Sequence, residues 1–470
     1  MRVLLINPKP LYYDEIAQKC FPPLNLLYLA ATLREGGHTV RLLDPNGLRL
    51  SDEETARIAR EWAPDLVGVS LFSDILREVH DFLRFLRPRL PGAKFVIGGP
   101  HVSSLYRRVM EEFEEVDFAI REEAEFTLVQ LADALERGTG LDDVGGLVRR
   151  EAGALVERPL GEPIEDLGEI PLPARDLIDE AYGKGAYYTL LVKERPLDVM
   201  ITSRGCPFKC GFCHNVNWSY RHRKIDDILS ELHLIRSRGI RHVEICDVTF
   251  TVHRDRALAV LEAIARANLG MALRIKSRAA DVDRELMRLA RAAGVYQIAF
   301  GMESAAPAVL RRMNKEMEVT DYARALRLCA EFGLAAHTGW ILGYPGETPE
   351  TIGQTLDFIA AYKPTTANIF LLKPYPETQV YRDALAEGTL AQDWTVGMKE
   401  FPWIRLPWAR ERRVLEDAVR RAQRRIYFRP HYAWSLGSRA LRDVNALMVR
   451  YAFQEFAKVA RRGPVRSWNA

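Results

Sequence analysis

The sequence predicts an α/β protein that contains two series of alternating strands and helices, followed by a basic segment that is mainly helical. Short apolar runs alternate with amphipathic helical stretches over residues 1–145, and a second such series fills residues 196–385. Residues 386–470 lose this alternation, and the intervening residues 146–195 carry scattered Gly and Pro typical of a linker. A chain of 470 residues is long enough for two or three domains.

The first series predicts a doubly wound, Rossmann-like parallel sheet. Its expected strands are 3–6, 40–43, 66–70, 95–97 and 118–120. Ligands of such sheets bind beyond the carboxyl ends of the strands. The loops at that edge contain Pro8, Ser70, Leu71, Gly98, Gly99, Pro100, His101 and Glu123. Paired glycines there let a large ligand approach the backbone closely, although Gly and Pro also end strands in proteins without a ligand.

The second series contains six strand–helix units. Its expected strands are 199–202, 242–246, 272–275, 297–300, 336–342 and 367–371. Six units are too few to close an eight-stranded barrel, so we expect an open, partial (β/α)6 TIM barrel. Chemistry in such a fold takes place at the carboxyl ends of the strands, and the first strand leads directly into the most specific motif of the chain.

That motif is a run of three cysteines, Cys206, Cys210 and Cys213, with the spacing Cys-x3-Cys-x2-Cys. Three thiolates on one tight loop can bind three irons of a 4Fe–4S cluster, which usually has four Cys ligands, and leave the fourth iron open. A zinc site with His214 as its fourth ligand is an alternative, and a structural accident is another. The other cysteines are scattered and are expected to be small buried side chains: Cys20, Cys246 and Cys329.

Composition excludes several classes of protein. The chain has 66 Lys and Arg against 63 Asp and Glu, a formal net charge of +3, which gives no reason to expect nucleic-acid binding. No apolar run approaches the ~20 residues of a membrane-spanning helix, and the N-terminus lacks the pattern of a signal peptide. The few cysteines show no pairing pattern, which predicts a cytoplasmic location and disfavours a structural disulfide.

The C-terminal segment differs from the rest of the chain in charge. Residues 401–470 hold 16 Lys and Arg against 5 Asp and Glu. Aromatic side chains are interspersed there: Trp403, Trp408, Tyr427, Tyr432, Trp434 and Tyr451. One interpretation is a surface for anionic membrane lipids or an acidic substrate. The alternative is a solvated helical cap whose long charged side chains cover apolar surface.

Taken with these motifs, the chain resembles the cobalamin-binding radical S-adenosylmethionine (SAM) enzymes. Within them it is most similar to the branch of the anaerobic magnesium-protoporphyrin ester cyclase and its hopanoid- and lipid-modifying relatives. The resemblance covers roughly residues 1–385. It rests on the cysteine loop, which includes Phe212, and on the stretches 22–30, 98–101, 247–251, 300–304 and 343–348.

The resemblance implies a 4Fe–4S cluster, SAM and cobalamin as cofactors, and an electron donor such as flavodoxin or ferredoxin. In this family SAM binds the open iron, and one electron cleaves it to a 5′-deoxyadenosyl radical. By position, Phe212 would contact the adenine through its backbone, Asp247 the methionine amine, and Ile341 the adenine beside the Gly343 turn. The carboxylate and ribose would be gripped by Lys276, Ser277, Arg278 and Glu303. Ordinary ion pairs at the barrel rim and core packing are the alternative roles for these side chains.

One departure concerns the cobalt ligand. Many cobalamin domains carry Asp-x-His-x-x-G, and no such string occurs here, because His38, His80 and His101 all fail the spacing. We therefore expect His101 to be a loop residue beside the corrin, and cobalamin to bind with its own base displaced and no histidine beneath the cobalt. A degenerate domain that binds no cobalamin is the alternative.

The resemblance leads to an expected function, methylation of an unactivated carbon of a small molecule. Rival functions are an oxidative cyclase or another radical reaction with the same cofactors, methylthiolation of RNA, and, from a different class, a zinc-stabilised non-catalytic binding protein. The basic, aromatic C-terminus suggests a substrate that is large, flat or lipid-like and carries acidic groups.

Overall fold

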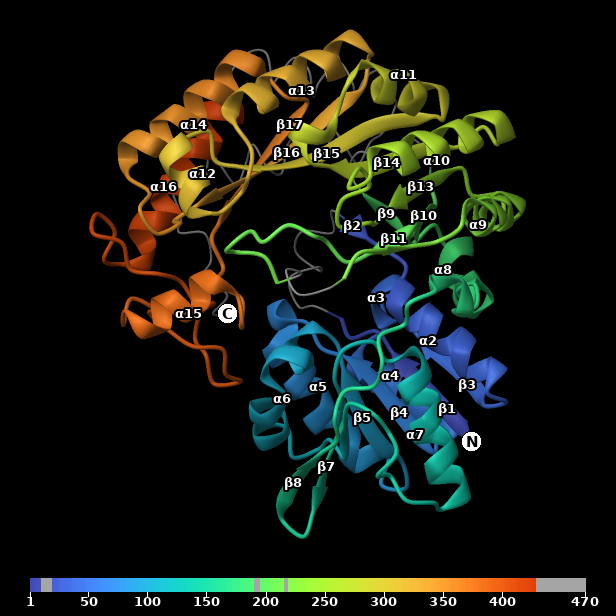
Figure 1. Ribbon diagram of the computed structural model, residues 1–470. Coiled ribbons are helices and arrows are strands. Elements are labelled where there is room, and N and C mark those ends of the chain that lie inside the picture. The colour runs from blue at the N-terminus through green and yellow to red at the C-terminus, as the bar shows by residue number, and fades with distance from the viewer. Residues whose placement is uncertain (10–18, 190–194, 215–218, 428–470) are drawn as a thin grey trace. The chain divides into compact units, whose positions relative to one another are not determined.

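Figure 1 shows the computed structural model, which describes residues 1–9, 19–189, 195–214 and 219–427. The chain forms two compact units. The first comprises Met1–Thr189 together with the short segment Trp394–Met398, and the second comprises Leu190–Asp393 and Lys399–Ala470. The predicted C-terminal features Tyr432, Trp434 and Tyr451 lie outside the described residues.

The first unit is built on a seven-stranded sheet with strand order β3-β1-β4-β5-β6-β7-β8. Pairs from β3 to β6 are parallel, whereas β7 and β8 pair antiparallel. The inner strand β1 buries every side chain from Val3 to Ile6, as expected for a strand covered on both faces. The strands are β1 (Arg2–Ile6), β3 (Thr39–Leu43), β4 (Leu66–Ser70), β5 (Lys94–Gly98), β6 (Phe118–Ile120), β7 (Leu147–Glu151) and β8 (Ala154–Glu157).

Helices connect the parallel strands and cover the sheet (Figure 1). Helix α2 packs against α7, and α4 against α5, as right-handed crossovers on opposite faces require. The helices are α2 (Leu24–Glu35), α3 (Pro45–Leu48), α4 (Asp52–Trp62), α5 (Leu76–Leu86), α6 (Pro100–Glu112), α7 (Glu125–Arg137) and α8 (Asp179–Gly183). Residues 146–195, expected as a linker, contain β7, β8 and α8, as well as β9 (Tyr188–Thr189), which pairs with β2 (Lys19–Cys20).

The second unit contains a six-stranded, all-parallel sheet with order β10-β13-β14-β15-β16-β17. Each strand–helix unit steps one position along the sheet, which is the arrangement of a partial TIM barrel. The strands are β10 (Leu197–Met200), β13 (His242–Ile245), β14 (Ala272–Ser277), β15 (Val295–Glu303), β16 (Ala335–Leu342) and β17 (Thr366–Leu371); the small ribbon β11 (Ser203–Arg204) with β12 (Arg221–His222) follows β10. These two sheets confirm the predicted fold class.

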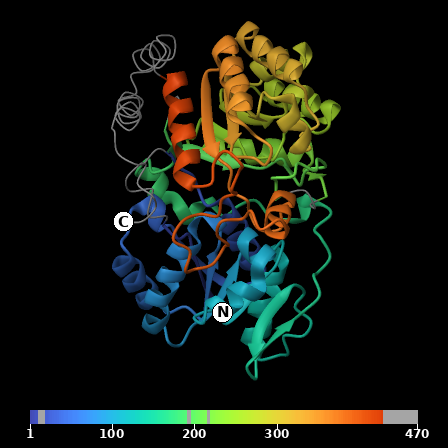
Figure 2. The same cartoon turned by 90° about the vertical axis from the view of Figure 1, so that its left-hand side faces the viewer.

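Helices line one face of this second sheet (Figures 1 and 2). The helices of this unit are α9 (Ile225–Ser237), α10 (Arg254–Ala267), α11 (Arg284–Ala292), α12 (Pro307–Arg312), α13 (Val319–Glu331), α14 (Pro349–Tyr362), α15 (Gln379–Ala386) and α16 (Arg412–Tyr427), of which α15 lies away from the sheet. The last of these packs beside β17 and α14. None of the helices in the described part of the chain is sufficiently long and apolar to cross a bilayer.

The other face of the sheet is polar. Alternate residues of a strand point to opposite faces, and on β14 Leu273 and Ile275 are buried while Lys276 is partly exposed. The register places Lys276 beside Ala299 and Ala299 beside His337, so these side chains share that polar face. The small Ala299 leaves room between two polar groups near the carboxyl edge.

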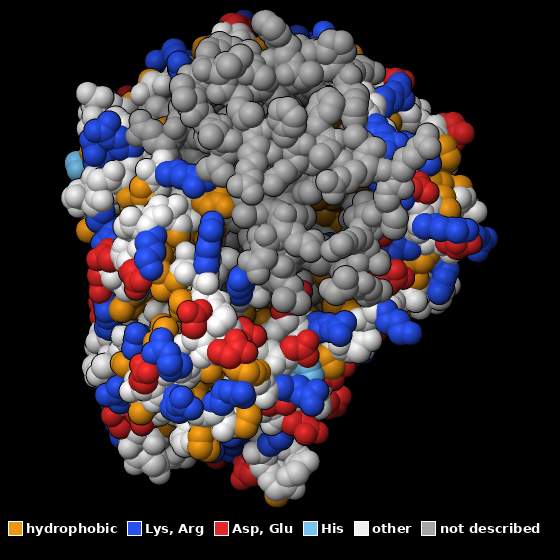
Figure 3. Space-filling view, turned by 180° about the vertical axis from the view of Figure 1, so that it is seen from behind, with side chains coloured by type: hydrophobic (Ala, Val, Ile, Leu, Met, Phe, Trp, Pro, Cys, Tyr) orange, Lys and Arg blue, Asp and Glu red, His pale blue; other side chains and the backbone are white. Residues whose placement is uncertain are grey.

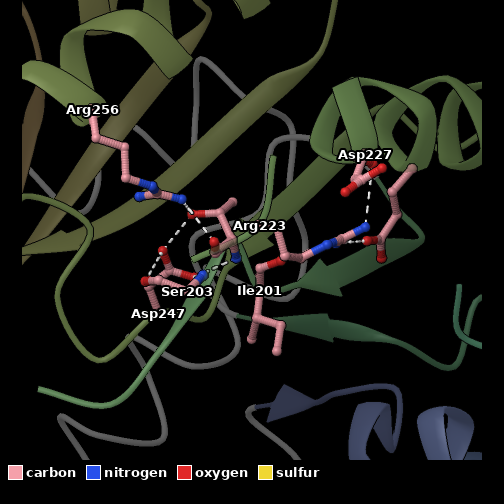
Figure 4. Close-up of polar contacts among 8 residues, drawn as sticks. Ile201, Ser203, Arg223, Asp227, Asp247 and Arg256 are labelled. Atoms are coloured by element: carbon pink, nitrogen blue, oxygen red, sulfur yellow. Dashed lines mark hydrogen bonds and ion pairs between the residues drawn. The ribbon is translucent and has the colours of Figure 1, made fainter. Parts of the chain in front are cut away.

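A buried ion pair fixes the start of the barrel. Arg223, which follows β12, pairs with the fully buried Glu231 of α9. Its guanidinium also donates to the carbonyls of Ile201, at 3.1 Å, and Asp227, at 3.2 Å (Figure 4). One cation thus links the residue after β10 to the first turn of α9.

Replacing Glu231 by alanine is expected to lower the free energy of unfolding by about 3–5 kcal/mol, because the Arg223 charge is left buried without its partner. The matched control is Glu262→Ala on α10, whose ion pair with Arg266 is exposed and worth less than about 0.5 kcal/mol. Chemical denaturation of both variants measures the difference, and equal losses would contradict the role given to Arg223.

Candidate active site

The cysteine loop begins where the first barrel strand ends. Strand β10 leads into β11, and the loop then runs through Cys206, Cys210 and Cys213 at the carboxyl edge of the sheet. Cys206 is buried, while Cys210 and Cys213 are partly exposed. The Cys213 N–H donates to the Cys210 carbonyl at 3.0 Å, which closes a tight turn and places the two thiols on one short segment.

The three thiols do not lie within the distance that a single zinc ion sets for its ligands. Tetrahedral zinc has Zn–S bonds of about 2.3 Å, which bring its sulfur ligands within about 4 Å of one another. Of the described side chains, only one group of three His, Cys, Asp or Glu has all its ligand atoms within 4.8 Å, namely His38, Asp133 and Glu136, and the cysteines are not such a group. Three thiols on one loop remain the ligand set expected for three irons of a cluster.

A buried carboxylate anchors the entry to this loop. Asp247 follows β13 and is 1% exposed. Its carboxylate accepts hydrogen bonds from the backbone N–H groups of Thr202, at 2.6 Å, and Ser203, at 3.1 Å, and also from both hydroxyls (Figure 4). The predicted contact of Asp247 to the methionine amine stays a prediction, whereas these four bonds make it a positioning residue of the loop.

The cationic side chain of Arg256 also binds the segment that Asp247 holds. Arg256 of α10 donates from Nη2 to the Thr202 carbonyl at 2.7 Å and to the Thr202 hydroxyl at 2.8 Å. Figure 4 shows Asp247 and Arg256 converging on this segment from β13 and α10. The backbone at Thr202 and Ser203, shortly before Gly205 and Cys206, is therefore held by charge-assisted bonds, which are stronger than neutral ones.

The turn that follows α12 supports the other end of the loop. The Gly211 N–H donates to the Met313 carbonyl at 2.8 Å, and the Asn314 side chain donates to the Lys209 carbonyl at 2.8 Å. Asn314 and Glu316 both have left-handed φ values, 49° and 51°. Such strained conformations persist where the surroundings demand them, and here they turn the backbone toward the cysteine loop.

Two cations lie over the two phenylalanines of the loop. The Arg278 guanidinium lies 3.3 Å from the ring centroid of Phe208, and the Lys315 ammonium lies 5.5 Å from that of Phe212. Arg278 also donates to the carbonyls of Lys315, at 3.0 Å, and Glu316, at 2.8 Å. Burial raises the pKa of the Cys210 thiol, while the nearby Lys315 and Arg278 cations oppose that shift.

The predicted SAM-binding side chains lie along the same edge of the barrel. Glu303 ends β15 with a φ of 65° and pairs with Lys315 at 3.3 Å. Lys276 is 39% exposed and lies 3.9 Å from the Glu244 carboxylate. Ser277 is buried and shares a 2.8 Å hydrogen bond with the Thr251 hydroxyl. The structure thus gathers these residues near the cysteine loop, and their contacts to SAM stay predictions.

A buried glutamate shapes the Gly343 turn. Gly343 has a φ of 90°, which favours glycine, and its N–H donates to Glu347 Oε2 at 2.6 Å. Glu347 is 1% exposed, and desolvation raises its pKa to about 8. Phe212 meets the Tyr344 ring edge-on at 6.5 Å, and both Phe212 and Ile341 pack on one apolar cluster. The Gly343 turn thus contacts the cysteine loop through its aromatic neighbour.

The predicted ligand loops of the first unit also come together at one edge. Pro8 follows β1 and Ser70 ends β4, on the two strands between which the strand order reverses, where doubly wound sheets bind ligands. The Leu71 N–H donates to the Gly98 carbonyl at 2.7 Å, which joins two of the loops. Gly99, with a φ of 110°, has no room for a side chain, since a Cβ would lie 2.8 Å from the Leu71 carbonyl oxygen.

Two more predicted residues complete that edge. Pro100 occupies the first turn of α6, and the Glu123 carboxylate, beyond β6, accepts from the Ile164 N–H at 3.3 Å. The residues present fit a large ligand such as a corrin, because Gly98 and Gly99 carry no side chains and leave the backbone at the end of β5 partly exposed.

The three histidines of the first unit have other partners. His38 lies at the opposite edge, just ahead of β3, near Asp133. His80 packs edge-on against Phe113 at 4.9 Å. His101 is 2% exposed and its Nδ1 hydrogen-bonds the Ser73 hydroxyl at 2.8 Å. The expectation that no histidine lies beneath the cobalt stays a prediction.

Sequence reasoning missed the residues that hold the loop from outside it. Thr202, Ser203 and Arg256 carry no motif, and Asn314 and Lys315 lie in what reads as an ordinary connection between helices. Their roles depend on contacts between residues far apart in the chain, such as the 105 positions between Lys209 and Asn314. The one signal close to the loop in sequence was the polar pair Thr202 and Ser203 ahead of Gly205, whose hydroxyls could have been expected to bond a neighbouring strand end.

Replacing Arg278 by methionine is expected to weaken retention of the cluster by roughly tenfold to a hundredfold. Two hydrogen bonds worth about 1 kcal/mol each and a cation–π contact are lost, and 1.4 kcal/mol is a factor of ten. The rate at which a chelator removes iron from the anoxic protein measures the effect. Arg254→Met, which removes an exposed cation at the start of α10, is the matched control, and equal rates in both variants would contradict this role.

Glu347 predicts a pH-dependent stability. Its folded pKa of about 8 lies above the ordinary value of 4.5, so the ionised form is disfavoured in the folded protein. The wild type should lose stability as the pH rises from about 5 to about 9, whereas Glu347→Gln, which is neutral throughout, should not. We expect a difference of about 5 kcal/mol at pH 9 and less than about 1 kcal/mol at pH 5, measured by denaturation across that range. If the free energies of unfolding of the two proteins changed with pH in parallel, Glu347 would already be ionised in the folded protein, which would contradict its raised pKa.

Comparisons with known proteins agree with this geometry. Residues 200–359 match the Radical SAM superfamily, and residues 16–132 match the B12 binding domain. An uncharacterized methyltransferase of Pyrococcus horikoshii is 28% identical over 92% of this chain and 93% of its own length. The anaerobic magnesium-protoporphyrin IX monomethyl ester cyclase of Rubrivivax gelatinosus is 28% identical over 82% of this chain and 70% of its own. The hopanoid C-3 methylase of Methylococcus capsulatus is 29% identical over 81% and 72%.

A solved structure shares the fold. The radical SAM methyltransferase TsrM from Kitasatospora setae, determined with cobalamin and a [4Fe-4S] cluster bound, superposes with a TM-score of 0.69 at 22% identity, over 82% of this chain and 75% of that one. The two matched families and the three-thiol loop confirm the resemblance and the three cofactors that it implied. The chain is therefore a cobalamin-binding radical SAM enzyme, with a 4Fe–4S cluster, SAM and cobalamin as its cofactors.

Proposed function

We propose that the protein methylates an unactivated carbon of a small-molecule substrate. The observation that carries the proposal is the preformed loop of three thiols at the carboxyl edge of a partial barrel, in a chain that also matches the B12 binding domain. Relatives named as methyltransferases or methylases, among them the proteins of Pyrococcus horikoshii and Methylococcus capsulatus, support methylation over other outcomes.

In this proposal the chain's own residues divide into ligands and positioning groups. Cys206, Cys210 and Cys213 bind three irons, and Asp247 with Arg256 sets the direction in which the loop leaves β10. Residues at the carboxyl edge of the barrel contact SAM, Phe212 and Gly343 through their backbone and the others through their side chains: Lys276, Ser277, Arg278, Glu303 and Ile341. When bound, the cluster supplies the electron that cleaves SAM and cobalamin supplies the methyl group.

Loops of the first unit hold the corrin in this proposal. The contacts come from Pro8, Ser70, Leu71, Gly98, Gly99, Pro100, His101 and Glu123. Their backbone is fixed by hydrogen bonds between the loops, so little ordering is needed when the cofactor binds. His101 lies beside the corrin in this proposal, with its Nδ1 bonded to the Ser73 hydroxyl.

A small-molecule substrate and an external reductant complete the reaction, and flavodoxin or ferredoxin is the proposed reductant. Figure 3 shows basic and acidic side chains side by side over the described part of one face, which agrees with the balanced charge and gives no support to a nucleic-acid substrate. The basic C-terminus, with its predicted lipid or acidic-substrate contact, lies mostly outside the described residues.

The test uses SAM whose methyl group carries three deuterium atoms. Anoxically reconstituted full-length protein is incubated with this SAM, a low-potential reductant and metabolite extracts of cells lacking the protein. We expect 5′-deoxyadenosine together with a new product that retains the label. The variant in which all three cysteines are replaced by alanine should form neither.

Two other outcomes would overturn the proposal. 5′-Deoxyadenosine with an unlabelled, ring-closed product would indicate a cyclase, the activity named for the relative of Rubrivivax gelatinosus. A colourless protein that binds one zinc and leaves SAM intact would indicate the non-catalytic alternative.

A further inference from the structure

A short segment of the C-terminal region is part of the first unit. The chain joins this unit at Trp394 and leaves it at Met398, while the residues on both sides belong to the second unit. We call residues 394–398 the strap. Trp394 is 0% exposed, although the strap forms neither helix nor strand. A tryptophan fully buried in irregular chain indicates a specific docking contact, since so large a side chain is rarely buried completely.

The strap lies along one face of α6. The Trp394 ring meets His101 edge-on, with 6.1 Å between ring centroids. The Trp394 carbonyl accepts from Arg108 Nη1 at 2.9 Å, and the Val396 N–H donates to Glu112 Oε2 at 3.1 Å. Arg108 and Glu112 are four residues apart and therefore lie on one face of α6, whereas His101 lies in its first turn.

These contacts lie on both sides of a kink. Leu105, inside α6, has φ −128° and ψ 33°, far from helical values. A kinked helix lacks part of its hydrogen-bond ladder, and contacts from another segment can restore its rigidity. The strap contacts His101 before the kink and Arg108 and Glu112 after it, so it braces the two halves against each other.

The braced end of α6 carries the predicted ligand loops. The His101 N–H donates to the Leu71 carbonyl at 3.3 Å, and His101 Nδ1 bonds the Ser73 hydroxyl at 2.8 Å. His101 therefore lies between Trp394 and the loop that follows β4. A shift of Trp394 would remove its ring contact from His101, the residue that bonds both Leu71 and Ser73.

We propose that the strap is a positioning element of the cobalamin site, with Trp394 holding His101 and both loops in the arrangement that receives the corrin. The inference rests on the cobalamin site proposed at this edge. It gives a role to part of the C-terminal region, for which the sequence suggested only a cap or a lipid surface.

The experiment measures binding of hydroxocobalamin to the full-length anoxic protein by absorption titration. Trp394→Ala should bind at least about tenfold more weakly, while its iron content stays at the wild-type level. Trp394→Phe, which keeps an aromatic ring against His101, should restore affinity to within about threefold. The matched control is Trp403→Ala: this tryptophan is also buried, in the same region but in the second unit, and its loss should leave affinity within about twofold.

A second variant keeps the test decisive if Trp394→Ala fails to fold. Arg108→Met combined with Glu112→Met removes both hydrogen bonds to the strap without opening a cavity, and should weaken binding by roughly threefold to tenfold. Wild-type affinity in a folded Trp394→Ala protein, or in this double variant, would overturn the inference. Failure of the wild-type protein itself to bind hydroxocobalamin would instead overturn the proposed cofactor site, and the inference with it.

Discussion

The buried carboxylate of Asp247 is the constraint on which the active site depends. It accepts hydrogen bonds from both backbone N–H groups and both hydroxyls of Thr202 and Ser203. These bonds fix the direction in which the chain leaves β10. Hydrogen bonds to a charged group are worth about 1.5–3 kcal/mol each, and a carboxylate buried at 1% exposure would be costly without them. The barrel itself thus sets where the cysteine loop begins.

The middle of the loop is held by contacts from a turn that is distant in sequence. The strained turn around Asn314 meets Lys209 and Gly211, and Arg278 links that turn to Phe208. Two cations of this unit, Arg278 and Lys315, therefore lie close to the loop, and both favour the thiolate of Cys210. Such preorganisation lowers the ordering cost of assembling a cluster, and it places positive charge where thiolates must form.

The alternation of strand and helix was enough to predict both sheets, because each unit has its own local hydrophobic pattern. The cysteine loop and the carboxyl-edge loops were also visible, since their residues lie close together in sequence. The β7–β8 hairpin within 146–195 was not, because Gly and Pro there end short strands as well as they fill a linker. Trp394 could not be assigned either, because its partner Arg108 lies 286 positions away and no periodic signal marks the strap.

For the site residues, too, the sequence predicted which positions matter but not which contacts they make. Residue type and position were enough to predict that Asp247, Arg278 and the turn from Gly343 to Glu347 belong to the site. The role of each depends on its hydrogen-bond partners, which the sequence does not show. Asp247 is engaged by the loop that precedes the cysteines, and Arg278 by backbone carbonyls of another turn. The partner of His101 could likewise not be predicted from the sequence. His101 lies in a predicted ligand loop, and the structure shows that its Nδ1 is hydrogen-bonded to the Ser73 hydroxyl.

The central claim is that the loop binds a cluster with one iron left open for SAM. Electron–nuclear double resonance on the reduced, reconstituted protein with SAM carrying ¹⁵N in its amine tests this directly. A nitrogen coupling that shows the amine bonded to iron is the predicted result. A reduced cluster whose spectrum shows no coupling to the labelled amine would contradict the account.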